Sequence, residues 1–405
     1  MLGIGALTLF LSTPAQTYGF SVFIDPMLAE FGWSRSLISS AYTVATLISA
    51  GVVFLGGNLI DRFGYRRVMV VTTVLYVIAL FLMGSVANPA TLVFAFTLLR
   101  GTGSSVLTLT GRTLVSQWFV RRRGRAVSVV NLGKLLGMGV LPAANAVIIT
   151  HFGWRDAWRV NGVLVAALIP LAILFVHSRP EDLKQFPDGE QPTAPAGQAG
   201  TPREAEQYSW TLREAMRTRT MWLLLSLNIV PAMITNGLSF HQISILSERG
   251  LSSTTAATTF AIESAIALPM TLVAGWMIDR VGPRPILALG QATLLTTLVW
   301  LTIVDSAESA VVFGILRGLT SGVWILATEV TWPTYFGRRY LGSIVGLNFS
   351  LSFIGVAIGP LPFGVIYDAF GSYNYAIWGF AVLPALTICA ALLAKPPGPR
   401  PIATH

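Results

Sequence analysis

The sequence is poor in charged residues, cysteine and histidine, and each shortage excludes a class of protein. Only 11% of its 405 residues are charged, whereas a soluble domain carries about 25%. A single cysteine, Cys389, excludes internal disulfides. The four histidines are scattered and form no metal-binding cluster, and no Gly-Lys-Ser/Thr phosphate loop is present. We therefore expect no enzymatic activity, no metal site and no cofactor.

Apolar residues, in contrast, make up 53% of the chain, and the mean hydropathy is +0.67. Apolar stretches of about 20 residues are long enough to cross a bilayer as helices. The sequence predicts twelve such spans: 2–27, 35–60, 67–87, 91–118, 124–150, 156–177, 220–246, 252–277, 284–304, 308–334, 341–367 and 373–395. The first begins almost at Met1 with no cleavable signal ahead of it, so we expect it to be retained.

One long polar segment divides these spans into two groups of six. It is rich in Pro, Gly, Gln and acidic residues, a composition typical of a flexible linker. We predict an all-α membrane protein with an N-terminal six-helix bundle over 1–178 and a cytoplasmic linker over 179–219. A C-terminal six-helix bundle over 220–396 and a cytoplasmic tail over 397–405 complete the chain.

Most lysines and arginines fall in loops on the side of the two termini and the linker. Such loops stay in the cytoplasm, so both termini are predicted there, in a bacterial inner membrane. The net charge of +9 is thus a topology signal, and we expect no binding to nucleic acid. The expected surroundings are a lipid bilayer and the expected assembly is a monomer.

A repeat relates the two halves. Arg100–Phe119 and Arg317–Phe336 both begin with Arg-Gly and end with an aromatic residue and Phe. A second charge occupies the equivalent place in each copy, but its sign differs: Arg112 in the first and Glu329 in the second. Charges within membrane spans are costly and mark functional sites. Two six-helix repeats with a binding site between them are typical of secondary transporters.

The loop after the second span, Gly57–Arg67, contains Asp61-Arg62-Phe63-Gly64 and is matched in the second half by Asp279-Arg280-Val281-Gly282. It resembles the G-x-x-x-D-R-x-G-R-[RK] loop of the major facilitator superfamily, with Tyr65 as a departure. The resemblance implies two pseudo-symmetric bundles with alternating access, and a gating role for Asp61, Arg62 and Arg66. The alternative is that this loop only anchors the topology.

Several further segments resemble the monocarboxylate and oxalate/formate carriers of that superfamily. They are 16–23, 31–35, 118–119, 152–155 and 367–371. The eighth span departs from the pattern of those carriers, because it contains Glu263 and no basic residue. The resemblance implies a carrier for a small organic anion, a monocarboxylate, coupled to protons or working by exchange. The alternative is a proton-driven efflux pump for hydrophobic or drug-like compounds; a channel is the third class, which the repeat disfavours.

Basic side chains within the spans are the candidates for binding an anion. Arg100 and Arg317 lie near the predicted midplane, and a guanidinium suits the geometry of a carboxylate. The alternative is that they cap backbone carbonyls. Lys134 in the fifth span is a further candidate for the anion. Softer polar candidates line the first and seventh spans: Gln16, Tyr18, Asn236 and His241. For His241 the alternative is a satisfied packing residue.

Two further predictions concern coupling and gating. Glu263 lies near mid-depth in the eighth span, where a carboxyl group is suited to load and release protons. It either pairs with Lys134 or bonds a neighbouring helix. Arg112 and Glu329 lie near the cytoplasmic ends of their spans, and we predict that they pair across the pathway as an inner gate. The alternative is an Arg112 that snorkels and a Glu329 that bonds its own helix.

Overall fold

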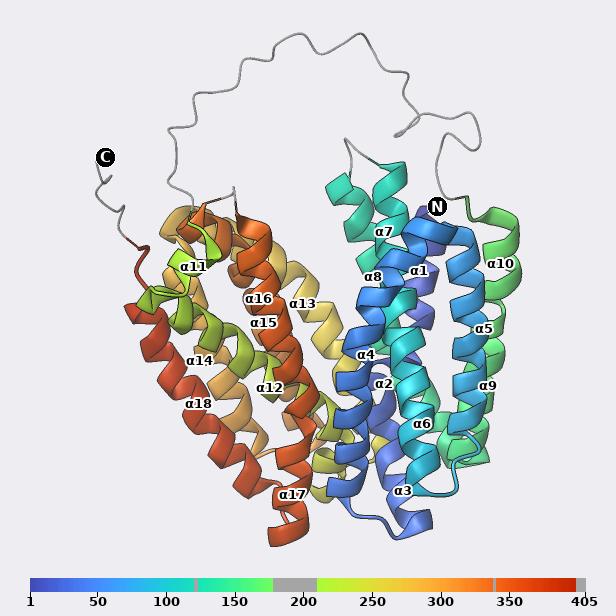
Figure 1. The fold of residues 1–405 in the computed structure, drawn as a ribbon. Coiled ribbons are helices and arrows are strands. Elements are labelled where there is room, and N and C mark those ends of the chain that lie inside the picture. Colours follow the sequence, from blue (N-terminus) through green and yellow to red (C-terminus); the bar gives the residue numbers. More distant parts are fainter. Residues whose placement is uncertain (120–122, 178–209, 338–339, 398–405) are drawn as a thin grey trace, which may run out of the picture.

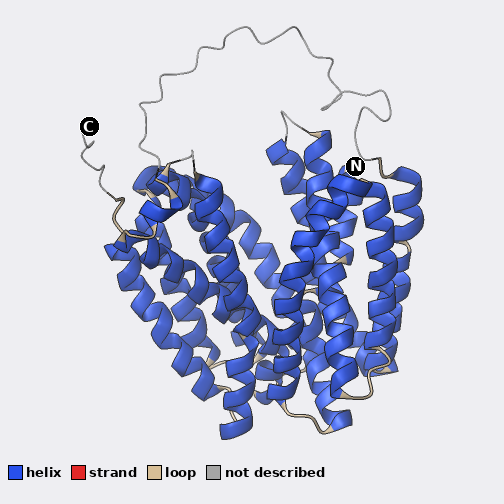
Figure 2. Ribbon diagram, viewed as in Figure 1, coloured by secondary structure: helices blue, strands red, loops and turns tan. Residues whose placement is uncertain are grey.

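The structure, a computed structural model, describes residues 1–119, 123–177, 210–337 and 340–397. In these ranges the chain consists of helices joined by short loops (Figure 2). The side chains of Asp61 and Glu329 lie outside the described residues. Most of the predicted linker, and the tail from residue 398, also lie outside them.

Helices fill both halves of the chain. The N-terminal half contains α1 (Leu2–Leu11), η1 (Thr13–Ala15), α2 (Thr17–Phe20), η2 (Ser21–Phe23), α3 (Ile24–Phe31), α4 (Arg35–Phe63), α5 (Tyr65–Met83), α6 (Pro89–Leu99), η3 (Arg100–Leu107), α7 (Thr108–Trp118), α8 (Arg123–Phe152), α9 (Trp154–Ala166) and α10 (Leu168–Phe175). The C-terminal half contains α11 (Leu212–Ala215), α12 (Arg219–Glu248), α13 (Ser253–Val281), α14 (Pro283–Leu301), α15 (Ala307–Phe336), α16 (Leu341–Ile358), α17 (Pro360–Phe370) and α18 (Asn374–Leu393).

These helices cover the twelve predicted spans. Within the described residues, nine segments are long and apolar enough to cross a membrane. Helices α4 and α15, with 29 and 30 residues, each extend about 44 Å at 1.5 Å per residue. The segments α1 to α3 together make up the first crossing. The predicted fold of two six-helix bundles is confirmed.

The two bundles stand side by side and are not equally close along their length (Figure 1). We call the end where α10 stops and α11 begins the linker face, and the end where α4 begins and α17 stops the distal face. The bundles diverge toward the linker face and meet toward the distal face (Figure 1). Hydrogen bonds join them in the distal half, for example from Thr17 Oγ1 to Asn236 Oδ1 (2.7 Å).

The predicted repeat is visible in the backbone. Gly64 ends α4 with φ of 78°, and Gly282 ends α13 with φ of 79°. Both glycines occupy the left-handed region that other residues rarely adopt, and each is followed at once by the next helix. Matching turns at matching positions explain why the Asp-Arg-x-Gly sequence occurs in both halves.

The first span, predicted over 2–27, is present but broken into several short helices. Pro14 has no N–H and disrupts the helical ladder. Tyr76 repairs the break from the third span: its hydroxyl accepts from the Ala15 N–H (3.1 Å) and donates to the Leu11 carbonyl (3.3 Å). A chain break inside a membrane needs such partners because lipid supplies none.

The eleventh span is broken between α16 and α17 for the same reason. Pro360 has no N–H to offer the Val356 carbonyl four residues earlier, and the Asn236 side-chain amide donates to that carbonyl instead (2.6 Å). Next to it, Thr43 Oγ1 from the other bundle donates to the Ala357 carbonyl (2.8 Å). The break is therefore a point at which three spans are joined.

The fourth span contains an eight-residue π-helical segment, η3, that begins at Arg100. Such segments are rare and concentrate at functional sites. Gly103 lies in this segment against Tyr76; a Cβ added there would meet the Tyr76 ring at 2.4 Å. Glycine is therefore required where the fourth span passes the repaired break of the first.

Candidate functional site

The C-terminal bundle holds a buried ion pair. Arg317 Nε donates to Glu263 Oε2 (3.1 Å), and only 3% and 4% of the two side chains are exposed. Arg317 Nη2 also donates to Ser239 Oγ (2.6 Å), and Ser321 Oγ donates to Glu263 Oε1 (2.7 Å). Both carboxylate oxygens thus have a donor. Buried charges are stable only when they are paired and hydrogen-bonded, so the four side chains act as one unit.

A stripe of glycines brings the two charged helices together. Gly314, Gly318 and Gly322 follow one another at four-residue intervals on α15, where it packs on α13. Cβ atoms at Gly318 and Gly322 would lie 2.8 Å from the carbonyls of Glu263 and Ala267. Small residues at this spacing permit close packing of membrane helices. Arg317 adjoins the stripe and so reaches the carboxylate directly.

Sequence reasoning selected Glu263 and Arg317 separately but left the pair undetected. It considered Lys134 as the partner of Glu263, and the structure corrects this: both carboxylate oxygens are occupied by Arg317 and Ser321. The glycine stripe on the tenth span was the signal that could have revealed the pair. Ser239 was not among the candidates that the sequence suggested.

Lys134 lies half-buried on α8 in the opposite bundle. Within the part of the chain that the structure describes, it makes no hydrogen bond or ion pair. Gly133 and Gly137 beside it pack on the first span, with Cβ positions 1.9 Å from Ala6 O and 2.1 Å from Thr13 Oγ1. These contacts hold the helix that carries Lys134 tightly against the first span.

Arg100 remains within the N-terminal bundle. Its guanidinium lies 4.4 Å from the centre of the Tyr42 ring, and Nη1 donates to the Ala15 carbonyl (3.3 Å). The Nε atom is buried without a partner. Tyr42 in turn shares a hydrogen bond with Thr17 Oγ1 (2.6 Å). Arg100 is therefore a cation held against an aromatic face, and its buried Nε–H is still unused.

Tyr18 and Gln16 lie on the short helices after the break of the first span. Tyr18 is buried, with its ring 6.1 Å from Phe260 of the other bundle. Its hydroxyl and the Thr13 hydroxyl are both buried without a partner. Gln16 is half-buried at the start of α2. Buried hydroxyls without partners are sites where a water molecule or a solute can bind.

Asn236 and His241 are engaged in joining the bundles. Asn236 accepts from Thr17 and donates to the carbonyl freed by the break before α17. His241 Nε2 lies 3.0 Å from the Pro360 carbonyl and 3.1 Å from Ser39 Oγ, and Nδ1 lies 3.0 Å from Tyr373 Oη. Because a carbonyl only accepts, Nε2 carries the proton and Nδ1 accepts from the tyrosine. Both predicted ligands already have partners in this conformation.

The predicted gating residues are only partly described. Arg112 is exposed on α7 in the linker-side half and lies close enough to act electrostatically on Lys134 and Tyr18. Arg62 and Arg66 are exposed at the linker face. The side chains of Asp61 and Glu329 lie outside the described residues, so the predicted pair of Arg112 and Glu329 stays a prediction.

An apolar groove of about 300 Å³ lies between α8 and α13, one helix from each bundle. The two helices approach closely at Gly139, where a Cβ would lie 3.3 Å from the Ala261 Cα. The groove is lined by Leu132, Leu135, Leu136, Gly139, Val140, Ala261, Ser264, Ala265 and Leu268. Ser264 adjoins Glu263 in sequence, and its hydroxyl is buried without a partner. The groove therefore brings an apolar surface near the ion pair.

Comparisons with known proteins agree with this architecture. A family model described as Major Facilitator Superfamily matches residues 6–262 and 225–404. The probable sulfoacetate transporter SauU of Cupriavidus necator is 23% identical, over 98% of this chain and 93% of its own length. The aspyridones efflux protein apdF of Emericella nidulans is 22% identical, over 92% and 72%. A bacterial homologue of the human lysosomal transporter Spinster, solved in an inward-facing and occupied conformation, gives a TM-score of 0.74 at 14% identity, over 97% and 96%.

Proposed function

Because the chain belongs to the major facilitator superfamily and is thus a membrane transporter, we propose that it carries a small organic anion by alternating access, with a proton as the coupling ion. A monocarboxylate is the proposed substrate class. The relative SauU is described as a probable sulfoacetate transporter, and sulfoacetate is itself a small organic anion. The proposed setting is a bacterial inner membrane, with the linker face in the cytoplasm and the protein acting as a monomer.

The observation that carries the proposal is the buried pair of Arg317 and Glu263. A proton on Glu263 removes the charge that balances Arg317. A buried cation without a counter-charge costs several kcal/mol, and an incoming carboxylate restores the balance. Proton and anion thus favour each other's binding, which is the thermodynamic requirement for symport.

Lys134 completes the proposed substrate site from the opposite bundle. It has no partner among the described residues, whereas Arg317 already has one. An anion that contacts Lys134 on one side and Arg317 on the other would join the two bundles. The bundles diverge toward the linker face (Figure 1), which is the side that we assign to the cytoplasm.

The experiment is transport into proteoliposomes with lactate, pyruvate and oxalate as probes, run in two modes. In the first, a pH gradient drives net uptake; in the second, labelled and unlabelled probe exchange without a gradient. We expect Glu263→Gln to abolish the pH-driven mode and to retain exchange. Lys134→Ala should lose both modes. Glu308→Gln, which alters an exposed carboxylate at the start of α15, is the matched control.

A second candidate, proton-driven efflux of hydrophobic compounds, is favoured by the apolar groove between α8 and α13. Its lining offers an apolar surface to a lipophilic compound and includes Ser264, the residue that follows Glu263. The relative apdF is described as an efflux protein. The two candidates differ at Lys134: an efflux pump for neutral compounds should tolerate Lys134→Ala, and an anion carrier should not. A thermal-shift screen with carboxylates that gives no stabilisation, together with full activity of Lys134→Ala, would exclude the anion.

A further inference from the structure

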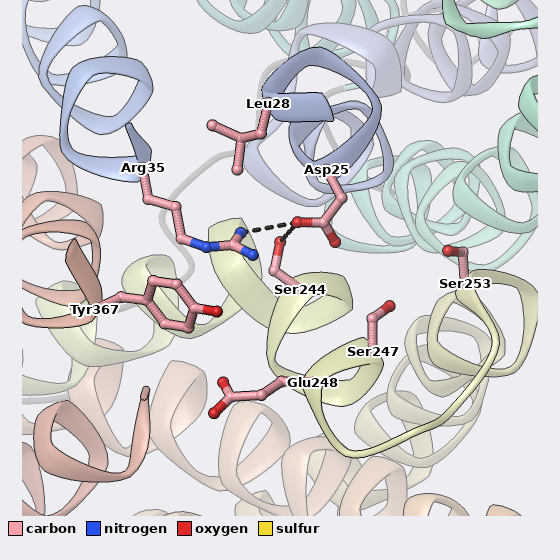
Figure 3. A pocket seen from close by; sticks show the side chains of 8 residues that line it. All are labelled: Asp25, Leu28, Arg35, Ser244, Ser247, Glu248, Ser253 and Tyr367. Atoms are coloured by element: carbon pink, nitrogen blue, oxygen red, sulfur yellow. Dashed lines mark hydrogen bonds and ion pairs between the residues drawn. The ribbon is translucent and has the colours of Figure 1, made fainter. Parts of the chain in front are cut away.

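A polar pocket of about 410 Å³ lies at the distal face, on the seam between the two bundles. Its walls come from α3 and α4 of one bundle and from α12, α13 and α17 of the other. Figure 3 shows Arg35 extending between Tyr367 and Asp25, with Ser244 beside the carboxylate. The sequence signals described above did not single out Asp25 or Ser244. The contacts around this pocket join the bundles on the side opposite to their divergence.

The first of these contacts is made by Asp368 at the start of α4. The Arg35 N–H donates to Asp368 Oδ1 (3.1 Å), and the Ser36 N–H donates to Oδ2 (2.7 Å). The first N–H groups of a helix have no partner within it. The local capping residue, Ser34, accepts the Leu37 N–H and leaves the N–H groups of Arg35 and Ser36 to another acceptor. A carboxylate from the opposite bundle therefore completes the cap and also opposes the positive end of the helix dipole.

The second contact is made by the Arg35 guanidinium, which touches groups of both bundles. Arg35 Nη1 pairs with Asp25 Oδ1 (2.8 Å) within the N-terminal bundle. Its guanidinium also lies 4.4 Å from the ring centre of Tyr367 and 5.3 Å from that of Tyr373, both in the C-terminal bundle. Asp25 Oδ1 in addition accepts from Ser244 Oγ of α12 (2.8 Å). Each bundle thus contributes a carboxylate that binds the other.

Close backbone packing supports these contacts. A Cβ at Gly364 of α17 would lie 2.8 Å from Ser39 Oγ and 2.9 Å from the Arg35 carbonyl. Only glycine lets α17 approach α4 this closely. Rocking the bundles apart at the distal face must separate α17 from α4, and the two carboxylate contacts must break in the same movement.

We propose that Asp368, Arg35, Asp25 and Ser244 form a latch that holds the distal face shut, and that its strength sets how often the transporter opens on that side. The latch rests on the proposed alternating access and does not depend on the identity of the substrate. The distal-open state must break the cap, the stacking and the Asp25–Ser244 hydrogen bond together. Weakening one of them shifts the population of states toward opening.

The test measures opening by thiol labelling, which the single native cysteine makes simple. In a Cys389→Ser background, Ser21→Cys places a thiol at a site that is 1% exposed in the distal seam. Asp368→Ala should raise its rate of reaction with a membrane-impermeant maleimide about fivefold, the order expected from losing a charge at a helix terminus. Asp368→Asn should give a smaller increase, because the amide oxygen can still accept one N–H.

Two controls separate a latch from general loosening. Asp156→Ala removes another exposed distal carboxylate, whose ion pair with Arg159 (2.7 Å) lies within one helix, and should leave the labelling unchanged. Thr73→Cys tests a site buried inside the N-terminal bundle, which should stay unlabelled in every variant. Labelling of both Ser21→Cys and Thr73→Cys would mean that Asp368→Ala loosens the fold, and would overturn the latch.

Unchanged labelling of Ser21→Cys in both Asp368 variants, at an unchanged melting temperature, would also overturn it. Should Asp368→Ala fail to fold, Asp368→Asn and Arg35→Gln decide the question, since each weakens the contacts across the seam and leaves the packing at Gly364. If the latch proposal is refuted, the transport result expected for Glu263→Gln is unaffected. Failure of the proposed carrier mechanism would instead show as a parent protein whose Ser21→Cys thiol never reacts, with or without a pH gradient.

Discussion

Replacing Glu263 with glutamine keeps the shape of the side chain and removes its charge. The resulting loss in the free energy of unfolding therefore measures the contribution of the buried ion pair with Arg317. Removing one member of a buried pair costs about 3–5 kcal/mol, because the other charge is left uncompensated. Glutamine still accepts one hydrogen bond from Arg317 Nε, so we place Glu263→Gln at the lower end, about 3 kcal/mol. Arg317→Gln should cost a similar amount.

The double variant distinguishes this reasoning from a simple loss of packing. With both charges gone, no buried charge is left without a partner, and the loss should be clearly smaller than the sum of the two single losses. We expect a coupling energy of at least about 1.5 kcal/mol, within the range found for residues in contact. The free energy of unfolding is measured for all four proteins by denaturant titration in the same detergent.

A second measurement on the same variants tests whether an anion can replace the carboxylate. Glu263→Gln leaves the Arg317 cation ready to bind, so acetate should raise its melting temperature more than that of the parent. Arg317→Gln should show no such gain. Additive losses, with a coupling energy below about 0.5 kcal/mol, would refute the role of the pair. An equal acetate response in parent and Glu263→Gln would refute its link to anion binding.

Three further results are expected. If the pair of Arg112 and Glu329 acts as a gate, Arg112→Glu and Glu329→Arg should each lower the transport rate about tenfold or more. The double variant should restore transport through the reversed pair. A double variant that stays inactive would refute the gate. Gly359→Ala should destabilise the protein by about 1–3 kcal/mol through overpacking, because the new Cβ would lie 2.2 Å from a backbone carbonyl of α12; an unchanged melting temperature would contradict it. Hydrogen bonds from Arg155, and next in importance one from the Trp154 indole, lower the pKa of Glu30 from 4.5. Ionised Glu30 therefore stabilises the fold above pH 4.5, and this stabilisation is lost as the pH falls through the lowered pKa. Compared with the parent, Glu30→Gln should lose less stability on acidification in a pH series of melting curves.

Hydropathy and the internal repeat were enough to predict the positions of the spans and the two bundles. Periodicity gives the height of a residue along a helix but not the neighbour that its side chain meets. Glu263 and Arg317 were both placed near mid-depth, but Lys134 was the partner considered for Glu263, and the packing of α13 on α15 was needed to reveal Arg317 instead. The choice of partner depends on which helices touch, and that follows from long-range packing.

The sequence argument expected Pro360 to bend or break the eleventh span, but it did not foresee the break in the first span or the groups that satisfy either break. A proline inside an apolar run can bend a helix slightly or end it. The outcome depends on whether distant groups can satisfy the freed carbonyls. Tyr76 does so for the first span and Asn236 for the eleventh. Asn236 was predicted to bind substrate because it is polar and lies in the membrane, and the carbonyl that it serves became visible only in three dimensions.

The break before α17 also determines how far the distal face must move in order to open. Helix α17 has 11 residues and is therefore a rigid lever about 16 Å long, with its pivot at the Gly359–Pro360 junction. A turn of about 15°, the size of a typical subunit rotation, displaces the far end of such a lever by about 4 Å. That displacement carries the Asp368 carboxylate out of hydrogen-bonding reach of α4. Release of the whole seam also requires α3 to part from α12, because the hydrogen bond between Asp25 and Ser244 lies outside this lever.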